Sequence, residues 1–190
     1  TLFKENGMVG IKNQAGQIII PAAYEALGWS NGSFSVTGRV TGYKLKGSWG
    51  VLNLNNERIT PAQYFALTPS DGLIVASKRS ASFQVTTGCI DAEGKTVIPF
   101  AYTGIKVHSM RVVAFVREGN LFKHGLIDLE NKILIPFQFR NIYPIGSLRY
   151  AVEDFQGKTA LYSESGKQIS GFTIDSISQF SNNLAVIYEA

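Results

Sequence analysis

The chain repeats one pattern of residues five times along its 190 positions. A glycine or alanine is followed eleven residues later by a proline or glycine, at Gly10 and Pro21, Gly50 and Pro61, Gly88 and Pro99, Gly125 and Pro136, and Ala160 and Gly171. The second position of each pair lies 40, 38, 37 and 35 residues before the next. Such a period is typical of repeat architectures, in which neighbouring units share a core.

Each repeat contains the residues of a tight hairpin turn. Three residues after the first anchor stands a short polar side chain that hydrogen-bonds readily to local backbone: Asn13, Asn53, Asp91, Asp128 or Ser163. Six residues after the anchor stands a residue type that tolerates positive φ: Gly16, Asn56, Gly94, Asn131 or Gly166. The pattern predicts a type I turn followed by a left-handed residue in every copy.

Apolar residues at fixed offsets predict short strands on both sides of this turn. The residue after the first anchor is apolar in every copy, as Ile11, Val51, Cys89, Leu126 and Leu161. Further apolar stretches at 34–36, 73–75, 110–113, 148–152 and 184–187 predict another strand in each repeat. We therefore expect an all-β fold of five tandem antiparallel β-hairpin repeats of about 35–40 residues in an open curved array. The alternative is a closed five-bladed β-propeller, in which the first and last strands complete one sheet.

We expect residues 1–190 to form a single repeat domain. Its predicted units are approximately 8–47, 48–86, 87–123, 124–158 and 159–190, and residues 1–7 resemble the end of a preceding unit. The apolar runs are much shorter than the roughly 18 residues of a membrane-spanning helix, so we expect no membrane insertion.

Several stretches resemble the WG-type (tryptophan-glycine) β-repeat of bacterial proteins. The resemblance is carried by Trp49-Gly50, "NLNNE", "RITP" and Tyr64, and by "GCIDAEGKTVIPFAYTGI" and "HGLIDLENKILIPFQFRNI". The naming tryptophan is present only as Trp49, and Val9, Thr87, His124 and Thr159 take its place elsewhere. The resemblance implies β-rich repeat modules without a shared catalytic motif, often in cell-envelope or secreted proteins, which favours a periplasmic or secreted location.

The residues that could carry chemistry have structural interpretations. Cys89 occupies a predicted core position, and a single cysteine excludes an internal disulfide or a cysteine-based zinc site. Asp91 and Asp128 align with Asn13, Asn53 and Ser163, which indicates turn formation rather than acid–base catalysis. The histidines His108 and His124 lack an acidic cluster at metal-binding spacing. We therefore expect no enzymatic activity, no metal and no cofactor.

The charge is mildly positive, with 18 Lys and Arg against 14 Asp and Glu. A nucleic-acid-binding protein usually has a denser basic stripe, so we expect no nucleic-acid partner. Local basic and aromatic residues in the variable connections are candidate contacts for a protein partner, namely Trp29, Tyr43, Lys44, Lys46, Lys106, His108, Arg111 and Arg117. The alternatives are a merely solvated basic face and, for Trp29, packing against the next repeat.

These observations favour a non-catalytic, monomeric repeat module that presents variable loops to an acidic protein partner. One alternative is an immunity or inhibitor protein that neutralises a specific toxin or enzyme. Another is a cell-wall glycan-binding module, although the loss of four repeat tryptophans counts against repeated aromatic platforms.

Overall fold

The computed structural model describes residues 1–146, 148–181 and 184–189. These residues form β-strands, turns and irregular segments, and no helix that could cross a membrane occurs among them. The strands are grouped in antiparallel sheets, which confirms the predicted all-β class. The chain divides into two compact units, Thr1–Ala101 and Tyr102–Ala190.

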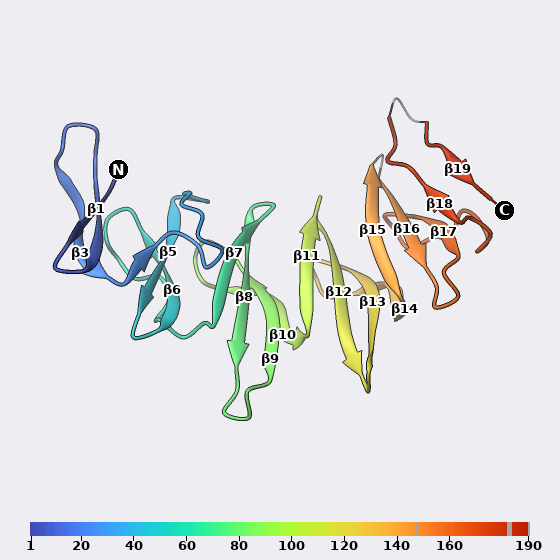
Figure 1. Cartoon of the computed structure of the whole chain (residues 1–190), viewed down its shortest axis with the longest axis horizontal. Coiled ribbons are helices and arrows are strands. Elements are labelled where there is room, and N and C mark those ends of the chain that lie inside the picture. The colour runs from blue at the N-terminus through green and yellow to red at the C-terminus, as the bar shows by residue number, and fades with distance from the viewer. Residues whose placement is uncertain (147, 182–183, 190) are drawn as a thin grey trace. The chain divides into compact units, whose positions relative to one another are not determined.

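The first unit contains three sheets, each a meander in which strands adjacent in the chain are paired (Figure 1). The first sheet consists of β1 (Leu2–Glu5), β2 (Met8–Lys12) and β3 (Ile18–Tyr24). The second consists of β4 (Ala26–Leu27), β5 (Val40–Leu45) and β6 (Ser48–Asn53). The third consists of β7 (Ala66–Ser70), β8 (Leu73–Arg79), β9 (Val85–Ile90) and β10 (Thr96–Tyr102), whose last residue lies at the unit boundary.

The second unit follows the same plan. Its first sheet consists of β11 (Gly104–His108), β12 (Arg111–Glu118), β13 (Leu121–Asp128) and β14 (Ile133–Phe139). The next consists of β15 (Asn141–Gly146), β16 (Arg149–Glu153) and β17 (Thr159–Ser163). A short pair, β18 (Ser176–Ile177) and β19 (Ile187–Tyr188), follows.

Each sheet except the β18–β19 pair joins the end of one sequence repeat to the start of the next. In the β11–β14 sheet, β12 comes from the third repeat and most of β13 from the fourth, and they pair from Arg111 opposite Asp128 to Glu118 opposite Leu121. The chain then passes to the next sheet through the single residue Arg140. Neighbouring repeats are therefore held together by backbone hydrogen bonds as well as by apolar packing.

The predicted hairpin turns are confirmed. All five turn residues that were expected to tolerate positive φ have it, with φ of 63° at Asn56, 65° at Asn131 and 80° to 82° at the three glycines. Oδ1 of Asp91 accepts hydrogen bonds from the backbone N–H groups of Glu93 and Lys95, and Asp128 makes the equivalent pair. The two aspartates therefore shape turns, as the alignment with asparagine and serine predicted.

In the first and third repeats, the repeated aromatic residue is hydrogen-bonded to the turn of the next repeat. The Tyr24 hydroxyl donates to Asn56 Oδ1 at 2.7 Å, and the Tyr102 hydroxyl donates to Asn131 Oδ1 at 2.6 Å. The glycine anchor leaves room for a ring, because a Cβ on Gly50 would lie 2.6 Å from the Tyr43 ring. Cys89 is fully buried at the core position predicted for it.

The two ends of the described chain belong to different sheets. β1 pairs with β2, and β19 pairs with β18, so the first and last strands do not complete one sheet as a closed propeller requires. No sheet formed by the described residues is closed into a barrel. The strand predicted at 34–36 is wrong, because that segment is an irregular loop and β5 begins at Val40.

Candidate protein-binding site

The candidate site is a hollow of about 210 Å³ in the second unit. The turn between β11 and β12 lies on one side, the turn between β15 and β16 on another, and the segment after β17 on a third. The residues that matter for its chemistry are His108, Ser109, Leu148, Arg149, Tyr150 and Glu164. Three segments distant in the sequence thus form one small surface.

The turn between β11 and β12 has a left-handed backbone that its two residues, a serine and a methionine, rarely adopt. His108 pairs with Arg111, so the turn consists of Ser109 and Met110, whose φ angles are 47° and 63°. Two positive φ values define a type I′ turn, which normally requires glycine or asparagine. A left-handed backbone costs a residue with a Cβ about 1–2 kcal/mol. Met110 bears this cost although its side chain is 68% exposed.

Other two-residue turns of this type in the chain have a glycine where Met110 stands. They are Asn6-Gly7, Lys46-Gly47 and Asp71-Gly72, all with positive φ at both residues. Glycine adopts this backbone without steric cost. The methionine is therefore a departure from the low-energy choice used elsewhere in this chain.

Leu148 is a second exposed apolar residue with a left-handed backbone at the same hollow. Its φ is 56° and its side chain is 55% exposed. Residues held in such conformations cluster at ligand-binding and switch sites, where the surrounding structure fixes them. Leu148 lines the hollow itself, whereas the exposed Met110 follows Ser109, which is the residue of that turn that lines the hollow.

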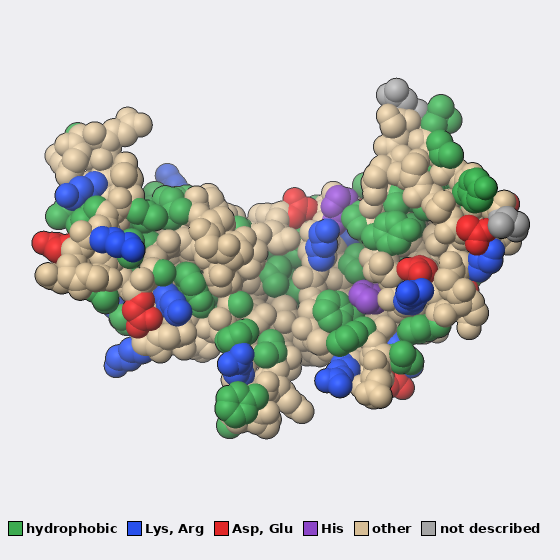
Figure 2. All heavy atoms as spheres, viewed as in Figure 1, with side chains coloured by type: hydrophobic (Ala, Val, Ile, Leu, Met, Phe, Trp, Pro, Cys, Tyr) green, Lys and Arg blue, Asp and Glu red, His purple; other side chains and the backbone are tan. Residues whose placement is uncertain are grey.

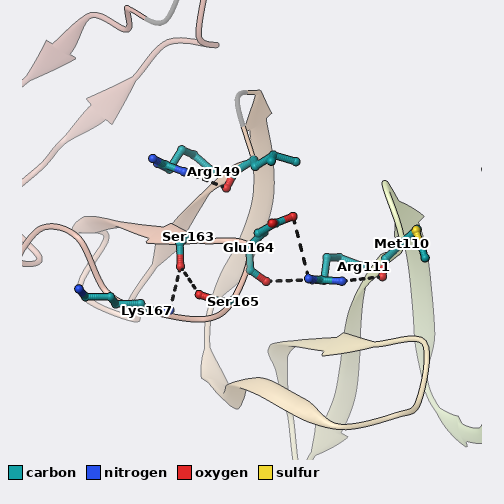
Figure 3. Close-up of polar contacts among 8 residues, drawn as sticks. Met110, Arg111, Arg149, Ser163, Glu164, Ser165 and Lys167 are labelled. Carbon is teal, nitrogen blue, oxygen red and sulfur yellow. Dashed lines mark hydrogen bonds and ion pairs between the residues drawn. The ribbon is translucent and has the colours of Figure 1, made fainter.

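Arg111 holds the turn between β11 and β12 against the segment after β17 (Figure 3). Its Nε donates to the backbone oxygen of Glu164 at 2.9 Å, and its Nη2 lies 4.0 Å from Glu164 Oε2. Its Nη1 also donates to the backbone oxygen of Met110 at 3.2 Å. One guanidinium therefore contacts both the strained turn and the segment after β17.

Tyr150 lines the hollow and is only 2% exposed. Burial raises the pKa of its hydroxyl to about 12, with Arg111 lowering it and Glu164 raising it by smaller amounts. The phenol therefore stays protonated at neutral pH and is not available as a general base.

The structure brings together two of the predicted contact residues, His108 and Arg111. Lys106 lies two residues before His108 on β11 and is exposed. Arg117 lies six residues beyond Arg111 on β12, roughly 20 Å away at the rise of a strand. Arg117 is bonded there to the backbone oxygen of Gly119, so it is not part of the site. On the face shown in Figure 2, lysine and arginine side chains are scattered rather than gathered in one stripe.

Trp29 and Tyr43 are corrected by the structure, because each side chain is only 1% exposed. The Trp29 Nε1 donates to Ser35 Oγ at 2.8 Å, and the Tyr43 hydroxyl donates to the backbone oxygen of Thr60 at 2.9 Å. Both rings are core residues and present no surface to a partner. Lys44 and Lys46 lie at the end of β5 and in the turn after it, in the first unit, and their role stays a prediction.

Sequence reasoning missed Met110, Leu148, Arg149 and Glu164. Met110 and Leu148 had been interpreted as the first apolar residues of strands, but β12 and β16 begin one residue later. The sequence signal that could have revealed Met110 is the lack of glycine or asparagine in the turn between two consecutive antiparallel strands.

The fold and site define an all-β repeat module. Two segments, residues 88–107 and 125–147, match the family described as "WG containing repeat". These two matches support the resemblance to the WG-type β-repeat that the residue pattern predicted. The comparison with curated proteins gives no match.

Three solved structures are similar to this chain at low sequence identity. One is described as "Crystal structure of the eukaryotic initiation factor", with 15% identity and a TM-score of 0.51 over 96% of this chain and 55% of that chain. Another is a putative TolB from Agrobacterium tumefaciens, with 12% identity and a TM-score of 0.40 over 86% of this chain and 68% of that one. A third is the WD40 beta propeller domain of Doa1, with 12% identity and a TM-score of 0.33 over 99% and 71% of the two chains. This chain spans about half of the initiation factor structure, and the likeness concerns the fold alone.

Proposed function

We propose that this repeat module binds an acidic protein partner without catalysis, through the surface formed by His108, Met110, Arg111, Leu148 and Arg149, here named the turn site. The observation that carries the proposal is Met110, an exposed methionine at a turn position where glycine has the lower energy. An exposed side chain gains little from folding at that position. A contact with a partner supplies a reason for keeping it.

The composition of the turn site supports a protein interface. Methionine and arginine are enriched at protein interfaces, and an apolar centre with a charged rim is their usual arrangement. Met110 and Leu148 supply exposed apolar surface, and Arg111 and Arg149 lie beside them. Guanidinium groups pair well with carboxylates, which favours an acidic partner.

The chemistry of the buried residues supports binding rather than catalysis. Burial raises the pKa of the Cys89 thiol to about 12, so it is not a thiolate nucleophile at neutral pH. Tyr150, the phenol in the hollow, has an equally raised pKa. A glycan platform would require exposed aromatic rings, and the exposed apolar side chains of the turn site are aliphatic. The immunity or inhibitor alternative is a special case of this proposal, in which the partner is a toxin or enzyme.

The experiment is a pull-down from lysate of the source organism, quantified by mass spectrometry. The bait proteins are the wild-type chain, the double variant Met110→Ser with Leu148→Ser, and a control, Phe83→Ser. Phe83 is a matched control because it is also a turn residue with positive φ, at 61°, and is 78% exposed.

We expect one protein to be enriched by the wild type and by the Phe83→Ser control. The double variant should lose it by about tenfold or more, because interface energy concentrates in a few apolar anchors. Enrichment that is unchanged in the double variant, or no enrichment by the wild type in any fraction, would contradict the proposal.

A further inference from the structure

The first unit has an unusually long connection between two paired strands. Residues 28–39 link β4 to β5, whereas two residues link β7 to β8 and β11 to β12. This connection contains the segment that was wrongly predicted to be a strand. Its conformation is set by the buried Trp29.

Trp29 fixes the middle of the connection at Ser35. Its Nε1 donates to Ser35 Oγ at 2.8 Å and lies 3.1 Å from the Ser35 backbone oxygen. That same oxygen accepts from Thr41 Oγ1 at 3.0 Å, and the Trp29 backbone N–H donates to the Ser33 oxygen at 2.8 Å. A loop held by a buried indole is preorganised, which lowers the entropic cost of binding.

The side chains on either side of Ser35 are exposed apolar groups. Phe34 is 42% exposed and Val36 is 44% exposed. They line an open hollow of about 590 Å³ together with Ile19 and Leu54, which are 40% and 38% exposed. A second hollow of about 420 Å³ shares Leu54. Both volumes lie in the range of ligand pockets, roughly 300–1,000 Å³.

The ionisable side chains that line the two hollows are both positive. Lys12 lines the first and Arg39 the second, and no carboxylate lines either of them. Neither cation forms an ion pair with another described residue. The Lys12 ammonium lies 4.5 Å from the centroid of the Phe3 ring, a contact that leaves its charge without a counter-ion. An apolar surface flanked by cations without a counter-ion is complementary to apolar side chains accompanied by carboxylates.

We propose that this surface, formed by Lys12, Ile19, Phe34, Val36, Arg39 and Leu54 and here named the 28–39 groove, binds an extended acidic peptide segment of a partner protein. In an extended peptide, side chains alternate between two faces. Apolar residues at every second position then contact Phe34, Val36 and Leu54, and the carboxylates between them reach Lys12 and Arg39 at the rim. The groove lies in the first unit and does not depend on the turn site.

The test measures fluorescence anisotropy of a labelled peptide of about ten alternating leucine and aspartate residues, titrated with the full chain at low salt, where charge contacts are screened least. Two control peptides replace aspartate by lysine or leucine by serine. The protein variants are Phe34→Ser, and Lys12→Glu combined with Arg39→Glu. The matched control is Lys95→Glu, because Lys95 is an exposed lysine of the same unit that lies outside the groove.

We expect the leucine–aspartate peptide to bind about tenfold tighter than either control peptide. Phe34→Ser and the double charge reversal should each weaken it by about tenfold or more, and Lys95→Glu by less than about twofold. Equal binding of all three peptides, no binding at about 1 mM, or an equal loss with Lys95→Glu would overturn the proposal. A wild-type dimer in light scattering that becomes monomeric in the groove variants would also overturn it, because the occupant would then be a second copy of the chain.

Discussion

Two turns at equivalent places in neighbouring repeats differ in how well their residues suit their backbone. The turn between β7 and β8 is Asp71-Gly72, and the turn between β11 and β12 is Ser109-Met110. Both have positive φ at both residues, so the backbone requirement is the same. The first turn meets it with glycine, whereas the second meets it with an exposed methionine at a cost in stability. The fold requires only the left-handed backbone of the turn, so the exposed methionine side chain is a feature of the surface and not a requirement of the fold.

Two arginines that lie at the start of a strand, one in each unit, also differ in what they contact. Arg111 begins β12 and is bonded to Glu164, which follows β17 in the fifth repeat, whereas Arg39 precedes β5 and is exposed. The second unit therefore has a turn that is strained and also fixed from outside. The following predictions test this comparison.

The largest effect is expected at alkaline pH, at the buried tyrosine in the hollow of the turn site. The raised pKa of Tyr150, about 12, means that the native chain retains a proton that the unfolded chain loses near pH 10. The contribution of Tyr150 to stability is therefore intact below pH 10 and falls between roughly pH 10 and 12, by up to about 1.4 kcal/mol per pH unit. Tyr150→Phe should make the alkaline fall in urea unfolding curves less steep, by up to about 1.4 kcal/mol per pH unit, while Cys89 and the other buried tyrosines, whose pKa values are also raised, keep the rest of it. An identical slope in Tyr150→Phe and wild type would refute the assignment.

The second prediction compares the two arginines. Arg111→Met keeps the aliphatic stem but removes the bonds to Glu164 and Met110, so it should lower the free energy of unfolding by about 2 kcal/mol. Arg39→Met should cost less than about 0.5 kcal/mol, because Arg39 is exposed. Denaturant unfolding of both variants gives the comparison. Equal costs would mean that Arg111 does not hold the turn.

The third prediction transfers the strain to the relaxed turn. Gly72→Met should cost about 1–2 kcal/mol, because the φ of 83° disfavours any residue with a Cβ. Gly72→Ala should cost nearly as much, since a Cβ there meets no atom within 4 Å and the penalty comes from the backbone alone. Thermal and urea unfolding measure both. A neutral effect of both variants would remove the energetic basis of the comparison.

The smallest effect is expected at a contact that both units share. Tyr24→Phe and Tyr102→Phe each remove one hydrogen bond from a hydroxyl to a turn asparagine, and each should cost about 1 kcal/mol. Clearly different costs, with Tyr188→Phe as the exposed control, would show that the repeats are not equivalent at this contact.

The repeat pattern and its hairpin turns could be predicted because local chemistry determines them. Asn56 and Asn131 tolerate the backbone that the turn imposes, and Asp91 and Asp128 bind nearby N–H groups, so five aligned copies show the same requirement. The anchor positions are glycine because a ring or a neighbouring strand lies too close for a Cβ. This requirement comes from tertiary contacts, but it could be predicted because the glycines recur at the same place in the repeats.

The candidate sites could be predicted only in part because they depend on departures from the repeat. His108 and Arg111 were found through their charge, but Met110 matched an apolar strand pattern and carried no turn signal. Trp29 was a candidate contact because it is an aromatic residue in a variable connection, yet the structure buries it. Trp29 lies in one core cluster with Tyr64, Leu67 and Ile74 of the second repeat, so the alternative interpretation, packing against the next repeat, is the one that the structure confirms.

The most direct test of the central claim is urea unfolding of wild type and Met110→Gly measured side by side. If Met110 is kept for a partner at the expense of the fold, glycine should relieve the left-handed backbone and raise the free energy of unfolding by about 1 kcal/mol. An unchanged or lowered free energy of unfolding would show that the methionine side chain stabilises the fold, and would contradict the claim that it is kept for binding.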